Sequence, residues 1–221
     1  MSRPARIRRK DLKRPDEFVT VTTQALAWAR MNQRTLTGIG AAIAVAIVAV
    51  AAFLGLRSAR VRDANVDLAH ALEVYRDPAK VGEAAKQLAE VSDRWSGTAA
   101  GDVAQLLAAE TELRRDNLDS ALATIQRAND HAWPPYLKQQ LLLVYGEVLE
   151  KKGQGAEAIA KYTEAASLGG PYTFEALLGQ ARLHEAAGDK TKAHALYEQI
   201  KRDFPDAPDH EFIEAKLATL S

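Results

Sequence analysis

Hydrophobic residues follow one another without interruption in one stretch of the chain and recur at helical intervals after it. The twenty-one residues from Leu36 to Leu56 comprise ten large apolar residues, seven alanines, three glycines and one threonine, and none is charged. As a helix this run would measure roughly 32 Å, which matches a hydrocarbon core of about 30 Å. Helices of soluble proteins keep a polar face, and this run has none. The pattern therefore predicts a transmembrane helix over residues 35–56.

A buried core helix and a cleaved signal peptide are the two alternatives. The apolar part of a signal peptide is only about 7–15 residues long and follows a short basic segment. Here the run is longer, thirty-five residues precede it, and Arg57 and Arg60 follow it directly. Ala49 and Ala51 offer at most a weak cleavage site. The run is best interpreted as an uncleaved signal anchor.

Charge is distributed unevenly on the two sides of this run, although the whole chain is neutral. Residues 1–34 contain nine Lys/Arg and three Asp/Glu, whereas residues 57–221 contain twenty Lys/Arg and twenty-six Asp/Glu. The positive-inside rule then places the N-terminus in the cytoplasm. In a bacterium with two membranes, we expect a single-pass protein of the inner membrane with residues 57–221 in the periplasm.

Residues 1–34 are predicted to form a basic cytoplasmic tail with a short amphipathic helix. A run of Arg and Lys such as that in residues 3–14 can bind nucleic acid, but next to a membrane span it sets topology and attracts anionic lipids. We expect inner-membrane lipids and no nucleic acid as its partners. Phe18, Leu26 and Ala29 fall on one side of the following helix, and Trp28 is placed as an interfacial anchor. Docking on a cytoplasmic protein is the alternative.

The remaining residues show helical periodicity and an internal repeat. No segment alternates convincingly with a period of two, so an all-α domain is predicted. A glycine, an alanine and a tyrosine recur thirty-five residues apart, as Gly153 and Gly188, Ala158 and Ala193, and Tyr162 and Tyr197. Thirty-seven residues before the first set stand Asp116, Ala121 and Ile125. Fixed intervals of this size indicate stacked helical units.

The repeated letters resemble the tetratricopeptide repeat (TPR) family, whose helix–turn–helix units are about 34 residues long. The family motif is matched in one unit at Leu142, Tyr145, Gly146, Leu149, Ala158, Tyr162 and Ala165, and in the next at Leu177, Gln180, Ala181, His184, Ala193, Tyr197 and Pro205. The resemblance implies a TPR-like α-solenoid of about four helix pairs. Residues 57–98 are expected to form a degenerate pair, and residues 99–221 the TPR-like repeats with a capping helix from Pro208 to Leu220.

Residue patterns for catalysis or metal binding are missing from the sequence. The absence of cysteine excludes disulfides, cysteine-ligated zinc and thiol nucleophiles. His184-Glu185 begins a zinc-protease pattern, but Gly188 stands where the second histidine is needed. Gly38 and Gly40 lie inside the apolar run, so they do not belong to a dinucleotide-binding loop. We expect a non-enzymatic protein without a cofactor or bound metal.

In the repeat family, the first helix of each pair lines a concave face that binds other polypeptides. The resemblance assigns this role here to Gln140, Leu143, Glu147, Glu150, Glu175, Leu178, Arg182 and Glu185, and less directly to Leu106, Glu110 and Leu113. Leucines between carboxylates suit an amphipathic helix or an extended polypeptide. Each of these residues is also compatible with an ordinary solvated helix position.

The order of segments, with a basic tail, one span and an exported repeat array, resembles the ancillary subunit family of the bacterial Sec translocon. That resemblance implies an adaptor that binds secreted polypeptides near the translocon together with periplasmic chaperones. A scaffold for another envelope assembly, such as outer-membrane, polysaccharide or division machinery, is the alternative. An enzyme would need a polar cluster that the sequence does not reveal.

Overall fold

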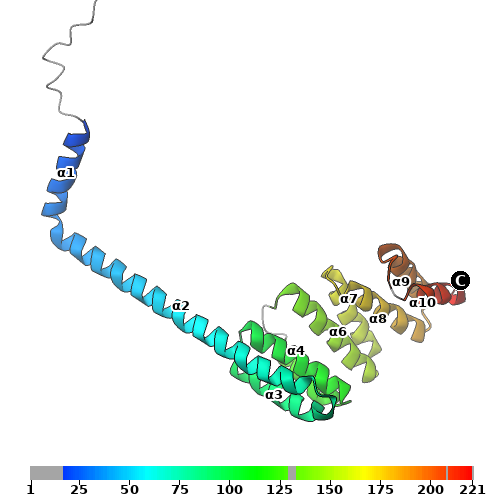
Figure 1. Cartoon of the computed structure of the whole chain (residues 1–221). Coiled ribbons are helices and arrows are strands. Elements are labelled where there is room, and N and C mark those ends of the chain that lie inside the picture. Colours follow the sequence, from blue (N-terminus) through cyan, green and yellow to red (C-terminus); the bar gives the residue numbers. More distant parts are fainter. Residues whose placement is uncertain (1–16, 129–132, 208, 221) are drawn as a thin grey trace, which may run out of the picture. The chain divides into compact units, whose positions relative to one another are not determined.

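The computed structural model of the chain describes residues 17–128, 133–207 and 209–220. Regular structure within these ranges is helical throughout, with no strand, as predicted. Two compact units are present, with the boundary between Ser58 and Ala59. The first contains α1 (Glu17–Met31) and the apolar part of α2 (Gln33–Tyr75) (Figure 1).

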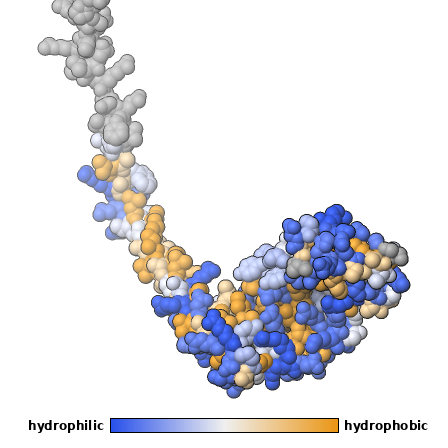
Figure 2. All heavy atoms as spheres, turned by 45° about the vertical axis from the view of Figure 1, so that its right-hand side comes forward, coloured by the Kyte–Doolittle hydropathy of each residue, from blue (hydrophilic) through white to orange (hydrophobic). Residues whose placement is uncertain are grey.

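The predicted span lies within α2, the one helix in the described ranges that is long and apolar enough to cross a membrane. Its apolar side chains are open to the surroundings: Val45 is 69% exposed and Phe53 is 64% exposed. A core helix of a soluble domain would be mostly buried, whereas none of this apolar run is buried within the chain. Figure 2 shows apolar side chains gathered around this part of the helix. Such a surface is stable only where lipid or protein covers it.

The predicted span, residues 35–56, is flanked by further helical residues on both sides. In the tail, residues 17–31 form the helix α1, on which Leu26, Trp28 and Met31 are exposed. The side chain of Phe18 and the basic residues 3–14 lie outside the described residues. At the other end, α2 does not stop at Leu56 but continues to Tyr75 without a break. Its last turns therefore form the first helix of the pair predicted in residues 57–98.

The second unit consists of helices that pack against their neighbours in chain order. Figure 1 shows them side by side from α3 to α10. After the end of α2 the elements are the 3₁₀ turn η2 (Pro78–Lys80), α3 (Val81–Arg94), α4 (Ala99–Arg114), α5 (Leu118–Ala128), α6 (Pro135–Lys151), α7 (Gly155–Ser167), α8 (Thr173–Ala186), α9 (Lys190–Asp203) and α10 (His210–Leu220). The last helix occupies the place of the predicted cap, although Pro208, its expected first residue, is outside the described ranges.

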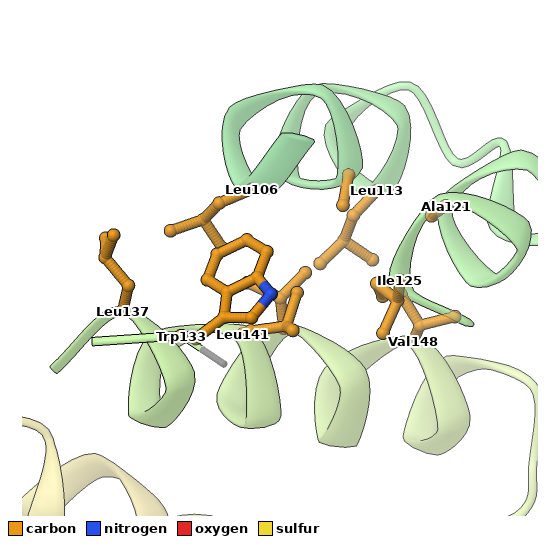
Figure 3. Close-up of a cluster of buried hydrophobic side chains, with 10 residues drawn as sticks. Leu106, Leu113, Ala121, Ile125, Trp133, Leu137, Leu141 and Val148 are labelled. Atoms are coloured by element: carbon orange, nitrogen blue, oxygen red, sulfur yellow. The ribbon is translucent and has the colours of Figure 1, made fainter. Parts of the chain in front are cut away.

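Apolar side chains form a series of clusters along this stack rather than one central core. In the cluster between α4 and α6, Trp133 lies between Leu106 on one side and Leu137 and Leu141 on the other (Figure 3). Further clusters join α6, α7 and α8, and then α8, α9 and α10. Another one joins α2, α3 and α4 around Leu88. Each helix is thus stabilised mainly by the helices next to it in the sequence.

The residues that recur at fixed intervals in the sequence form the same turn each time in the structure. Asp116, Gly153 and Gly188 have φ angles of 60°, 76° and 78°, in the left-handed region that glycine adopts most readily. In each case the next residue donates a backbone hydrogen bond of 2.9 Å to the carbonyl five residues earlier, which closes the preceding helix. Asp116 thus occupies the same position as the two glycines, as the spacing predicted.

Tyr162 on α7 fits between two helices because glycines face its ring from both sides. A Cβ atom on Gly146 of α6 would lie 2.5 Å from the ring, and one on Gly179 of α8 would lie 2.8 Å from it. Tyr162 itself is 2% exposed. Gly146 is one of the positions that match the family motif, and the structure identifies the ring that packs against it. Gly179 was not singled out in the sequence.

Candidate functional site

A pocket of about 310 Å³ lies between α4 and α6, and we call it the central pocket. Three of the eight residues predicted to bind partners, Gln140, Leu143 and Glu147, line it together with Glu110 and Leu113. The remaining lining residues are Tyr75, Arg114, Val144 and Tyr172. Residues that the family resemblance assigned to one face in two successive repeats therefore line the same pocket.

A directed chain of hydrogen bonds crosses the central pocket. The Tyr172 hydroxyl donates to Oε1 of Gln140 at 3.1 Å, and Nε2 of Gln140 donates to Oε1 of Glu110 at 2.8 Å. Because the Gln140 amide is used on both sides, its orientation is determined by its neighbours. On the opposite edge, the Arg114 guanidinium lies 4.7 Å from the centre of the Tyr75 ring. These contacts hold the polar groups of the pocket in place before any partner arrives.

The two carboxylates of the central pocket are held in an unfavourable setting for a negative charge. Burial raises the pKa of Glu110, although the hydrogen bond from Gln140 and the charge of Arg114 oppose this effect. Partial desolvation by surrounding protein atoms also raises the pKa of Glu147, although its side chain still reaches solvent. The charge of Arg182 opposes this rise, and the charges of Glu110 and Glu150 add to it. A negative charge on Glu110 therefore makes ionisation of Glu147 less favourable.

We expect Glu110→Gln to raise the melting temperature at neutral pH, with a gain that disappears in acid. The folded state raises the pKa of Glu110 above its usual value of 4.5, so ionisation of this carboxyl favours unfolding. This destabilisation is absent below the pKa that Glu110 has in the unfolded chain, and it is complete above the raised pKa that Glu110 has in the folded protein. Glutamine keeps the oxygen that accepts from Gln140, so only the charge is lost.

The measurement is thermal unfolding followed by circular dichroism at about pH 4 and about pH 7.5. Glu157→Gln on exposed α7 removes the same charge outside the pocket and serves as control. A melting temperature that drops at neutral pH, or a gain of equal size at both pH values, would contradict the prediction.

Glu150 and Arg182, two other residues assigned to the face, are engaged with each other. The Arg182 guanidinium donates from Nε to Oε1 of Glu150 at 3.0 Å and from Nη2 to Oε2 at 2.6 Å. The Tyr162 hydroxyl donates to the same Oε2 at 3.1 Å. This tyrosine–glutamate–cation group connects α6, α7 and α8, so both charges are satisfied within the protein.

The same group recurs one unit later around Glu185. Tyr197 donates to Oε2 of Glu185 at 3.1 Å, and Lys216 of α10 donates to Oε1 at 2.8 Å. Burial, with the adjacent Glu185, raises the pKa of Tyr197 to about 12. The hydrogen bond from Lys216 lowers the pKa of Glu185. Glu185 thus connects the last repeat to the final helix.

The last two predicted face residues, Glu175 and Leu178, line a second pocket of about 570 Å³, which we call the terminal pocket. It is formed by the start of α8, the end of α9 and the connection to α10. Its other lining residues are Phe174, Asp203, Phe204, Pro205, Asp206, Ala207 and Asp209. All eight predicted residues are therefore accounted for by two pockets and two tyrosine–glutamate–cation groups.

The two pockets are lined by acidic, apolar and aromatic side chains, with one glutamine and one arginine. No group of three or more metal-ligating side chains occurs in the residues that the structure describes. The residues missed by sequence reasoning are chiefly Tyr75, Arg114 and Tyr172 in the central pocket. In the terminal pocket they include Phe204 and Asp206, which belong to the conspicuous acidic and aromatic stretch of residues 203–209.

Comparisons with known proteins return no relative for this chain. No family model, no curated protein and no solved structure matches it. The function therefore has to be inferred from the chain itself.

Proposed function

We propose that this protein is a non-enzymatic, membrane-anchored adaptor whose helical unit binds polypeptides in its central pocket and along the neighbouring helices. The observation that carries this proposal is the central pocket. Gln140 and Glu147 of one repeat line it together with Glu110 of the preceding repeat. Its mixture of carboxylates, tyrosines and leucines suits the side chains of a polypeptide better than a small apolar ligand.

A TPR-like solenoid is the arrangement that we propose for the helical unit. The left-handed turns at Asp116, Gly153 and Gly188 support this arrangement, because they recur at intervals of thirty-seven and thirty-five residues. The groups centred on Glu150 and Glu185 support it as well, since in both a tyrosine hydroxyl and a basic side chain from a later helix donate to the glutamate. In such a stack, successive units add to one continuous binding surface.

We further propose an inner-membrane location, with the helical unit in the periplasm and the translocon and periplasmic chaperones as partners. The exposed apolar run of α2 supports the membrane, and the excess of Lys/Arg before it supports the orientation. The choice of the Sec translocon rests on the resemblance in segment order.

Photo-crosslinking from the pocket in living cells tests the proposal. A benzophenone amino acid is placed at Glu147 or at Glu175, both exposed, and as a control at exposed Glu157 on α7. We expect adducts with translocon subunits, periplasmic chaperones or secreted polypeptides from the first two positions and not from the control. Adducts with outer-membrane, polysaccharide or division proteins would instead favour the scaffold alternative. Identical patterns from all three positions would contradict a binding role for this face.

A further inference from the structure

The terminal pocket has an apolar floor supported by the core behind it. The rings of Phe174 and Phe204 meet edge to face with their centres 5.7 Å apart and their planes at 73°. Leu178 lies beside them, and all three are only partly buried. They pack against the cluster of α8, α9 and α10 that contains Tyr197 and Ile213. The floor is therefore held rigidly while one side of it stays open.

Carboxylates surround this floor. Glu175 belongs to α8, Asp203 to the end of α9, and Asp206 and Asp209 to the connection that leads to α10. Arg202 pairs with Asp203 at 2.9 Å. Among the described residues, the other three carboxylates have no ion-pair partner, and all three are exposed. The rim thus keeps a local excess of negative charge next to a hydrophobic surface.

We propose that the terminal pocket docks a polypeptide segment in which large apolar side chains are flanked by lysine or arginine. The apolar side chains would cover Phe174, Leu178 and Phe204, and the basic ones would reach the rim. This inference rests on the proposed polypeptide-binding function and adds to it the class of segment that is recognised.

Charge decides between this occupant and two others. A second copy of the helical unit would bring like charge, since residues 57–221 contain twenty-six acidic and only twenty basic side chains. Anionic lipid head groups would be repelled by the same rim. A basic and apolar polypeptide meets both features of the pocket, and such complementary charge also speeds association.

Peptide binding to the full-length protein tests the inference. The protein is placed in nanodiscs of zwitterionic lipid, and fluorescence anisotropy follows a fluorescein-labelled peptide that repeats the motif KLFK. Two comparison peptides repeat ELFE, which keeps the apolar side chains, or KSSK, which keeps the charges. Empty nanodiscs give the background. We expect KLFK to bind about tenfold or more tightly than either comparison peptide, and more weakly in high salt.

Variants then locate the binding. The triple variant Glu175→Gln, Asp206→Asn, Asp209→Asn is expected to weaken binding of KLFK about tenfold, and Leu178→Ala to weaken it by a similar factor. The control is Glu73→Gln, Glu83→Gln, Glu157→Gln, which removes three exposed charges outside the pocket. The rim residues are exposed, so the triple variant is expected to fold even if Leu178→Ala does not.

The possible failures can be told apart. If KLFK binds equally well to the wild type, the rim variant and the control, this pocket is not the docking site, while polypeptide binding by the protein stands. If ELFE or KSSK binds as tightly as KLFK, the proposed specificity is wrong. If no peptide binds to the wild type, the inference is overturned, and the crosslinks from Glu147 decide separately on the proposed function.

Discussion

Replacing Tyr162 by alanine is expected to lower the free energy of unfolding by about 3–5 kcal/mol, the usual cost of truncating a buried aromatic side chain. The ring fills the space between Gly146 and Gly179, neither of which has a side chain that could occupy it. Because both positions are glycine, α6 and α8 have no side chain there that could move into the space left by the ring. The loss would also free Glu150 from one of its hydrogen bonds.

Urea unfolding of the full-length protein, followed by tryptophan fluorescence, measures the effect. Tyr162→Phe keeps the ring and removes only the hydroxyl, so its cost should be smaller, about 1–3 kcal/mol for a hydrogen bond to a charged group. Tyr136 on α6 is 55% exposed, and Tyr136→Ala is the matched control with almost no expected effect. Equal losses for Tyr136→Ala and Tyr162→Ala would show that the ring does not hold the helices together.

Two arginines in the apolar run should prevent stable membrane insertion. In Ile43→Arg, Ile47→Arg, each charge near the middle of a span costs about 2.5–3.5 kcal/mol. The ten large apolar residues together favour insertion by only a few kcal/mol, at about 0.3–0.6 kcal/mol each. The balance therefore becomes unfavourable when both charges are present.

Carbonate extraction of a cell lysate reports the result. Wild type is expected in the membrane pellet and the arginine variant in the supernatant or degraded. Val61→Arg, Val66→Arg introduces the same charges on the same helix beyond the run and should remain in the pellet. Recovery of Ile43→Arg, Ile47→Arg in the pellet at the wild-type level would argue against the span.

The prediction for Glu110 and the one for Tyr162 address different parts of the same helical unit. Glu110→Gln removes a charge that the fold tolerates at a cost, whereas Tyr162→Ala removes a contact on which the stack depends. Opposite signs at neutral pH are therefore expected. That contrast separates residues available to a partner from residues that build the surface.

Local chemistry made much of the fold readable from the sequence. An uncharged run such as residues 36–56 has no polar face at any helical phase, so a helix long and apolar enough to cross a membrane was recognisable from one stretch of chain. Left-handed turns are restricted mainly to glycine and a few polar residues, so the spacing of Asp116, Gly153 and Gly188 was visible in the sequence before the structure showed a turn at each. These features depend on residues close together in the sequence, and no distant contact is needed to predict them.

Contacts between helices were decided by the tertiary structure alone. The resemblance to the repeat family assigned Gln140, Glu147, Glu150 and Arg182 to one face, but it did not reveal that Arg182 reaches back to Glu150 while Glu147 remains in a pocket. Nor did it indicate that Tyr172 would bind Gln140, or that the connection around Asp206 would complete a second pocket beside Leu178. Periodicity determines the side of a helix on which a residue lies, whereas the distance and angle between helices determine which side chains meet.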